Sequence, residues 1–290
     1  MQLDGRRQST NVDDRRGHST ATKAGGIGLG GLIIGGLIYI LMGGNPSDVI
    51  GSVAGQMMNP SEITVAGDYT PTAEEEELAV FASQILAGTE DVWTSIFEQN
   101  GLKYIPPKLV LFSGAVQSGC GGATASSGPF YCSADQCVYL DLSFFTSMKK
   151  QIGADGDFAY AYVIAHEVGH HVQYLLGTLQ QAHNQMNRTN EKEANKISVR
   201  LELQADFYAG VWACNDNKKY HSLEAGDVEE GMAVASKIGD DYLQKQAYGY
   251  TVPDSFNHGT SAQRAKWLKK GLSTGDPSQG DTFSIAYNQL

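Results

Sequence analysis

Residues 158–176, FAYAYVIAHEVGHHVQYLL, decide the fold of this chain. Apolar side chains recur in this stretch every three or four residues, which is the spacing of a helix with one buried face, and Gly177 follows as a stop signal. His166 and His170 stand four positions apart, so both imidazoles lie on the same side of the helix. The pattern therefore predicts a long helix that presents two histidines side by side.

The segment His166-Glu-Val-Gly-His170 matches the pattern H-E-x-x-H, in which two histidines on one helix bind a zinc ion. Glu167 lies next to them, where its carboxylate can take a proton from water. His171 points about 100° away from the pair and is not expected to be a ligand. Because the motif falls within a continuous helical pattern, it indicates one catalytic zinc ion rather than two incidental histidines.

A catalytic zinc ion has three protein ligands and keeps one position open. No third histidine follows His170 at the spacing found in three-histidine sites. Further along, Glu202-Leu-Gln-Ala-Asp206 places two carboxylates four residues apart on a predicted helix. We expect Glu202 to be the third ligand and Asp206 to hold the free N–H of a ligand histidine. Cys120, which follows a glycine, is the competing third ligand.

A pair of cationic residues lies near the C-terminus, in His258-Gly-Thr-Ser-Ala-Gln-Arg264. Attack on a carbonyl group builds negative charge on its oxygen, and a hydrolase must stabilise that charge. His258 is the candidate for this role, with Arg264 ordering the site. The same spacing also fits a helix-capping loop with an exposed arginine.

The remainder of the chain predicts an α+β domain. A helix is expected from the capping-box sequence Thr72-Ala-Glu-Glu75 to Asn100. Strands are expected at 108–113 and 138–142, further helices at 197–215, 223–246 and 262–270, and loops or helix ends at 178–196. The strand around Val138–Asp141 fits either a core strand or a sheet edge that pairs with an extended substrate.

Residues 24–44, AGGIGLGGLIIGGLIYILMGG, carry no charge. About 20 such residues are long enough to cross a bilayer core of roughly 30 Å, so they are predicted to form one transmembrane helix rather than a cleaved signal peptide. Residues 1–23 have a net charge of +2 and are predicted to be a cytoplasmic tail. The chain is then a single-pass inner-membrane protein with its catalytic domain in the periplasm or outside the cell.

Residues 45–72 contain three prolines and no sustained periodicity, which predicts a linker before a catalytic domain at 73–290. The whole chain has a net charge of −11, which argues against nucleic acid or an anionic membrane surface as a partner. Within residues 24–44, the spacings Gly26-xxx-Gly30 and Gly31-xxx-Gly35 would allow a homodimer contact between two membrane helices.

Several blocks of the sequence resemble the bacterial neutral zinc metallopeptidases of the YpfJ type, and the resemblance spans nearly the whole chain. It implies a zincin fold with a thermolysin-type active-site helix, one N-terminal anchor, and zinc bound by His166, His170 and Glu202. The late histidine and arginine are also similar to those lining the site of membrane prenyl-proteases. The blocks are Gly5–Ser9, Asp13–Gly17, Gly128–Cys132, Val138–Asp141, His166–Gln173, Glu202–Asp206 and His258–Ser261.

The resemblance also bears on the four cysteines, which would face an oxidising compartment in the predicted topology. It implies a disulfide between Cys120 and Cys132. A second pairing, Cys137 with Cys214, is our hypothesis, since neither cysteine is usual for the family. The family usually carries a cysteine where this chain has Phe207.

Together these patterns predict zinc-dependent hydrolysis of a peptide or protein substrate, with Glu167 as the general base. One alternative is a non-catalytic zinc-binding scaffold of the cell envelope, whose metal would be closed off by a fourth ligand such as His183 or His221. Another is a zinc amidohydrolase that acts on non-peptide amides, which would need the same water and the same base.

Overall fold

The computed structural model describes residues 1–17, 69–153 and 155–290. This part of the chain divides into two compact units. The helical unit consists of Met1–Gln8, Gln84–Pro106 and Ala154–Leu290. The sheet unit consists of Ser9–Ser83 and Pro107–Gly153. Helix α3 (Ala73–Gln99) runs through both, and Thr72 and Glu75 form the predicted capping box at its start.

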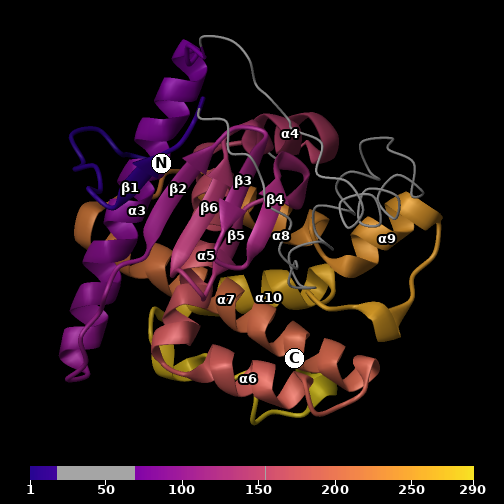
Figure 1. The fold of residues 1–290 in the computed structure, drawn as a ribbon. Coiled ribbons are helices and arrows are strands. Elements are labelled where there is room, and N and C mark those ends of the chain that lie inside the picture. Colours follow the sequence, from indigo (N-terminus) through magenta and orange to yellow (C-terminus); the bar gives the residue numbers. More distant parts are fainter. Residues whose placement is uncertain (18–68, 154) are drawn as a thin grey trace. The chain divides into compact units, whose positions relative to one another are not determined.

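The sheet unit contains a four-stranded sheet in the order β1-β2-β6-β5 (Figure 1). Strands β1, β2 and β6 run parallel to one another, and β5 runs antiparallel to β6. Since β6 pairs with β2 on one side and with β5 on the other, it is a core strand and not a free sheet edge. The four strands are β1 (Val12–Asp14), β2 (Lys108–Phe112), β5 (Phe130–Cys132) and β6 (Cys137–Asp141). Strands β3 (Ala115–Ser118) and β4 (Gly121–Thr124) form a separate antiparallel pair. Helix α4 (Ser143–Ile152) follows β6.

The structure confirms one of the two expected disulfides. Cys120 and Cys132 are joined, and both lie in the sheet unit. Cys137 and Cys214 are free thiols, and they belong to different units, so the second pairing was wrong. The disulfide also removes Cys120 as the competing zinc ligand.

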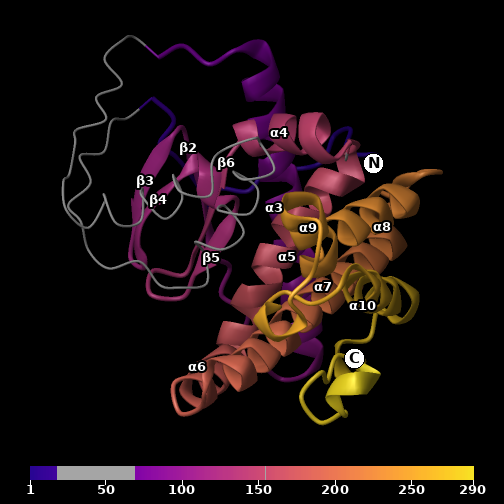
Figure 2. The same cartoon turned by 90° about the vertical axis from the view of Figure 1, so that its right-hand side faces the viewer.

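The helical unit is built around α5 and α7, with α8 and α10 beside them (Figure 2). Three tryptophans, Trp93, Trp212 and Trp267, are almost fully buried in its core. The helices are α5 (Asp157–Leu175), α6 (Thr178–Met186), α7 (Glu191–Tyr220), α8 (Asp227–Lys237), α9 (Asp240–Tyr248) and α10 (Ser261–Thr274), with short 3₁₀ turns at Pro253–Ser255, Pro277–Gln279 and Tyr287–Gln289.

Helix boundaries differ from the prediction in two places. Residues 178–196, expected as loops or helix ends, contain the whole of α6 and the start of α7. The start of α7 was not predicted because this helix packs against α5, α6 and α10 and shows no single apolar stripe. The predicted helix 223–246 is broken before α9. A side chain at Gly239 would lie 2.1 Å from the backbone nitrogen of Ser261, so the chain turns there on a residue without one.

Two glycines bring α7 and α10 into close contact. A Cβ atom on Gly210 would lie 2.3 Å from the carbonyl oxygen of Leu268, and one on Gly271 would lie 2.1 Å from that of Phe207. Such distances leave no room for a side chain on either helix. The two backbones therefore meet directly at this crossing.

The predicted membrane helix at 24–44 lies outside the described residues. Among the helices that the structure does describe, none combines the length and the apolar character needed to cross a bilayer. Residues 1–17, most of the predicted cytoplasmic tail, are instead part of the fold: β1 pairs with β2, and Arg6 binds Asp216 through two hydrogen bonds of 2.8 and 3.2 Å. The α+β architecture stands, but the anchor, the single-pass inner-membrane localisation and the membrane-helix dimer are withdrawn.

Candidate metal centre

Three side chains of the helical unit converge at the predicted site. His166, His170 and Glu202 each offer one ligand atom, and these atoms lie within 4.8 Å of one another. Nε2 of His166 is 3.1 Å from one carboxylate oxygen of Glu202, and Nε2 of His170 is 3.5 Å from the other. Two imidazole nitrogens and one carboxylate oxygen are the donor set of a catalytic zinc site, so these residues fit the metal.

A glycine in the motif allows the two helices to come together. A Cβ atom on Gly169 would lie 3.0 Å from the carbonyl oxygen of Ala205 and 3.1 Å from its Cα. Because α5 and α7 approach so closely here, Glu202 on α7 can reach the histidines of α5. The second position after the glutamate in the motif, Gly169, thus has a packing role.

His166 is supported by a buried carboxylate. Its Nδ1 lies 2.8 Å from Oδ1 of Asp206, which is 0% exposed. Tyr162 donates a hydrogen bond of 2.5 Å to the same oxygen. Arg264 donates from Nε to Oδ2 and from Nη2 to Oδ1, both at 2.9 Å. Asp206 therefore lies where it could orient His166, and Arg264 pairs with its charge.

The charges in this network shift several pKa values. Burial by itself raises the pKa of Asp206, but Arg264 and His166 lower it to about 2. Burial likewise lowers the pKa of His166, whereas the carboxylates of Asp206 and Glu202 raise it to about 10. The carboxylates that hold a proton on His166 also produce the negative potential that attracts a metal cation.

His170 is supported differently. Its Nδ1 lies 2.9 Å from Oε1 of Gln173, one turn further along α5. Sequence analysis assigned no role to Gln173, because a glutamine at i+3 on a helix is common and carries no signal of its own. Only the fold shows that its amide is buried and faces the ligand.

Glu167 is 7% exposed and projects from the same helix as the two histidines. Burial lowers the pKa of His170, while the charge of Glu202 and, to a smaller extent, that of Glu167 raise it. Glu167 therefore lies within electrostatic reach of the ligand atoms. This position suits a base that accepts a proton beside the metal.

His258 is 5% exposed and is held by Asp240, a residue that sequence analysis missed. Nδ1 of His258 is 3.0 Å from Oδ1 of Asp240, and the other oxygen accepts the backbone N–H groups of Asn257, His258 and Gly259. Burial lowers the pKa of His258, but Asp240 and then Glu202 raise it. Since Glu202 acts on this imidazole, His258 lies near the metal ligands.

Arg264 is buried, and all three of its guanidinium nitrogens have partners: two on Asp206 and one, Nη1, on the carbonyl oxygen of Ile238 at 3.3 Å. This geometry favours a role in ordering the site rather than contact with substrate. It does not fit the alternative of an exposed arginine behind a helix cap.

Within the part of the chain that the structure describes, no fourth ligand joins this group. Among the described residues, His166, His170 and Glu202 form the only cluster of three or more histidine, cysteine, aspartate or glutamate side chains spaced to hold a metal ion. His183 and His221 are not part of it. An open coordination position is what a catalytic zinc site requires.

Comparison with known proteins agrees with this geometry. The profile of the family described as "Putative neutral zinc metallopeptidase" matches residues 1–283. The uncharacterized protein YpfJ of Escherichia coli strain K12 is 47% identical over 290 residues, which cover 98% of this chain and 99% of that protein. The uncharacterized protein Rv2575 of Mycobacterium tuberculosis strain H37Rv is 45% identical over 193 residues, 63% of this chain and 64% of that protein. No solved structure matches the chain. The chain thus belongs to the neutral zinc metallopeptidase family, of the YpfJ type.

Proposed function

We propose that this protein hydrolyses peptide bonds with one zinc ion held by His166, His170 and Glu202, and with Glu167 as the general base. The observation that carries the proposal is the convergence of three zinc-ligand atoms within 4.8 Å, next to a carboxylate on the same helix. A structural zinc site closed by a fourth protein ligand needs no general base beside the metal. The family supports a zinc peptidase in general, and the individual roles are our assignment.

When bound, the zinc ion supplies Lewis-acid chemistry, polarising a carbonyl group and lowering the pKa of water to about 7. Glu167 accepts the proton of the attacking water and later passes it to the leaving amine. General acid–base catalysis of this kind contributes about 10²–10⁴ in rate. Asp206 keeps the proton on Nδ1 of His166, so that Nε2 is free to bind the metal.

His258 stabilises the oxyanion in this mechanism. Because Asp240 accepts the hydrogen on Nδ1, the opposite nitrogen, Nε2, is the one available to the site. A cationic imidazole can then donate to the carbonyl oxygen as negative charge develops there. Loss of one such donor costs about 10²–10³ in kcat.

The test compares the wild-type chain with Glu167→Gln for zinc content and for cleavage of a mixed peptide library. Glutamine keeps the shape of the side chain and cannot accept the proton, so we expect about one zinc ion per chain in both proteins and at least a 10²-fold loss of cleavage in the variant. Glu191→Gln, in the exposed first turn of α7, is the matched control and should retain full activity.

Full cleavage by Glu167→Gln would contradict the assignment of the base. Zinc in both proteins with cleavage by neither would favour the scaffold, or an amidohydrolase whose substrate is not a peptide. If the wild type, and not Glu167→Gln, releases product from non-peptide amides, the protein is an amidohydrolase.

A further inference from the structure

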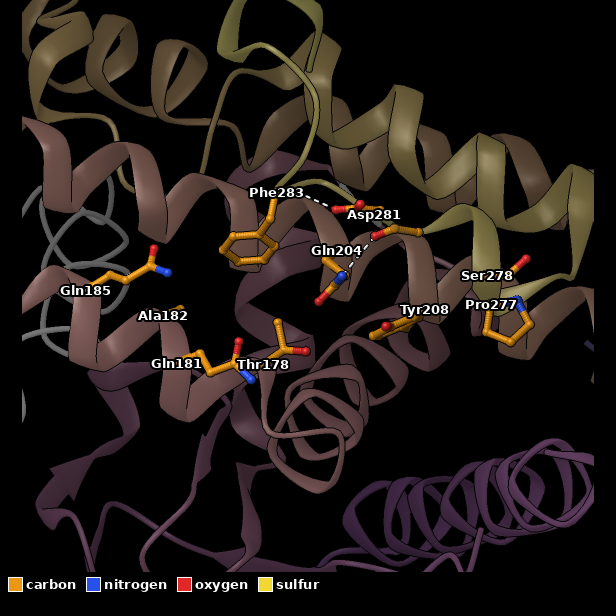
Figure 3. Close-up of a pocket in the computed structure, with 11 residues that line it drawn as sticks. Thr178, Gln181, Ala182, Gln185, Gln204, Tyr208, Pro277, Ser278, Asp281 and Phe283 are labelled. Atoms are coloured by element: carbon orange, nitrogen blue, oxygen red, sulfur yellow. Dashed lines mark hydrogen bonds between the residues drawn. The ribbon is translucent and has the colours of Figure 1, made fainter. Parts of the chain in front are cut away.

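A chain of hydrogen bonds leads from the ligand His170 to the C-terminal segment of the protein. Nδ1 of His170 lies 2.9 Å from Oε1 of Gln173. Nε2 of Gln173 donates to Oε1 of Gln204 at 3.1 Å, and Nε2 of Gln204 donates to the carbonyl oxygen of Gly280 at 2.9 Å. Figure 3 shows the outer end of this chain, with the dashed line from Gln204.

Backbone carbonyls determine the orientation of both amides. Nε2 of Gln173 also donates to the carbonyl oxygen of Leu201 at 2.7 Å, and that oxygen can only accept. The carbonyl oxygen of Gly280 fixes Gln204 in the same way. With its nitrogen committed to Leu201 and Gln204, Gln173 must turn its oxygen toward His170.

This arrangement determines which nitrogen of His170 carries the hydrogen. An amide oxygen only accepts, so Nδ1 of His170 must donate to Gln173. In the neutral imidazole Nε2 then keeps its lone pair for a metal ion, and Nε2 is the nitrogen that lies 3.5 Å from Glu202. The relay therefore presents His170 in the tautomer and the ring orientation that a metal ion needs.

Burial makes the relay rigid. Gln173 is 0% exposed and Gln204 is 6% exposed, so water has no access to the first amide and little access to the second. A flip of either one would leave two acceptors facing each other. The orientation of His170 thus depends on groups that do not touch it.

The outer end of the relay is also clamped to α7. Thr282 donates to the carbonyl oxygen of Arg200 at 2.7 Å, and Arg200 donates to the carbonyl oxygens of Thr282 and Ile285. A Cβ atom on Gly280 would lie 2.5 Å from the ring of Phe207, so this residue rests directly on α7. Arg200, Gln204 and Phe207 belong to the helix that carries Glu202.

Beside the relay, the same elements enclose a groove of about 370 Å³ (Figure 3). Its polar walls come from α6, α7 and the C-terminal segment, and Gln204 forms part of them. Gln181 lines this groove from α6 but is exposed and takes no part in the relay. It provides a control position with the same side chain.

We propose that Gln173 and Gln204 are positioning residues for His170, and that the segment Pro277–Ile285 is an integral part of the metal centre. The inference rests on the proposed zinc site but not on peptidase activity. It assigns a function to the C-terminal segment, for which the sequence shows no pattern and which begins at Pro277, 75 residues after Glu202, the last of the three proposed ligands.

The test measures zinc affinity by competition with a chelator, together with the visible spectrum of the cobalt-loaded protein. The proteins are the full-length wild type, Gln173→Met, Gln204→Met, the double variant, and the control Gln181→Met. Methionine matches glutamine in size and forms none of these hydrogen bonds. Thermal unfolding of each metal-free protein shows that it is folded.

We expect Gln173→Met to weaken zinc binding about 10–100-fold and to change the cobalt spectrum. Gln204→Met, one step further out, should weaken it less, and Gln181→Met should not change it. Because Gln204 acts through Gln173, adding Gln204→Met to Gln173→Met should cause no further loss. If Gln173→Met does not fold, Gln204→Met alone must weaken zinc binding several-fold.

Wild-type zinc affinity and an unchanged cobalt spectrum in both single variants would overturn the proposal, as would fully additive losses in the double variant. A wild type that binds zinc tightly but cleaves no peptide would contradict the proposed function and leave the relay standing. A wild type that binds no zinc would contradict both.

Discussion

The two ligand histidines occupy adjacent turns of one helix, yet they are supported in opposite ways. Behind His166 lies a charged group, Asp206, which binds Arg264 through two hydrogen bonds. Behind His170 lies a neutral amide, Gln173. The proposed metal site would thus hold one histidine through a charged group and the other through a neutral group, and each supporting group is itself hydrogen-bonded.

Both supports are neutral overall, because Arg264 cancels the charge of Asp206. The two sides should nevertheless respond differently to mutation. Breaking a buried ion pair leaves an uncompensated charge, whereas breaking an amide relay leaves only unsatisfied dipoles.

The largest effect on stability is expected from Arg264→Met, which removes the charge that compensates Asp206. Loss of one partner of a buried ion pair costs about 3–5 kcal/mol, so the free energy of unfolding should fall by that amount. Denaturant unfolding of the metal-free protein measures it. The exposed Lys269→Met on the same helix is the control, with a change within about 0.5 kcal/mol. Equal stability of Arg264→Met and Lys269→Met would contradict the view that Asp206, behind His166, depends on an ion pair with Arg264.

A smaller effect is expected from Tyr162→Phe on the same side. The hydroxyl of Tyr162 donates to Asp206, and a hydrogen bond to a charged group contributes about 1.5–3 kcal/mol. His166 and Arg264 still satisfy the same oxygen, so zinc affinity should change less than in Gln173→Met. Unfolding and chelator competition on the same samples separate the two quantities. A loss of zinc affinity in Tyr162→Phe as large as that in Gln173→Met would contradict this ranking.

The smallest effect is expected from Gly169→Ala, which acts on His166 and His170 at once. The new methyl group would meet the backbone of Ala205 at 3.0 Å, and α5 and α7 must move apart by a few tenths of an ångström. Overpacking of this kind costs about 1–3 kcal/mol, and we expect the lower end because the clash is marginal. Zinc affinity should fall modestly, since the displacement separates Glu202 from both histidines. An unchanged affinity would show that the helix separation is not critical.

The local part of this site was predictable from the sequence, because its spacing follows from helix geometry. His166 and His170 share a face at i and i+4, and Glu202 and Asp206 do so on α7. The contacts that complete the site were not predictable in this way. Asp240 contacts His258, and Gln204 contacts Gly280, only because of tertiary packing. No local sequence pattern predicts such partners.

The N-terminal residues show why the membrane prediction failed. Arg6 and Arg16 were interpreted as charges that keep a tail in the cytoplasm. In the structure, Arg6 binds Asp216, and Arg16 binds Asp14 and Glu76. Basic residues in ion pairs and in a membrane flank look the same in a sequence, because acidic partners such as Asp216 and Glu76 come from distant parts of the chain.

The most direct test of the metal centre is a crystal structure of the zinc-loaded protein with diffraction recorded at the zinc absorption edge. The account predicts one anomalous peak at about 2.0–2.2 Å from Nε2 of His166, Nε2 of His170 and a carboxylate oxygen of Glu202, with no fourth protein ligand. A peak at other residues, or a site closed by a fourth side chain, would contradict it.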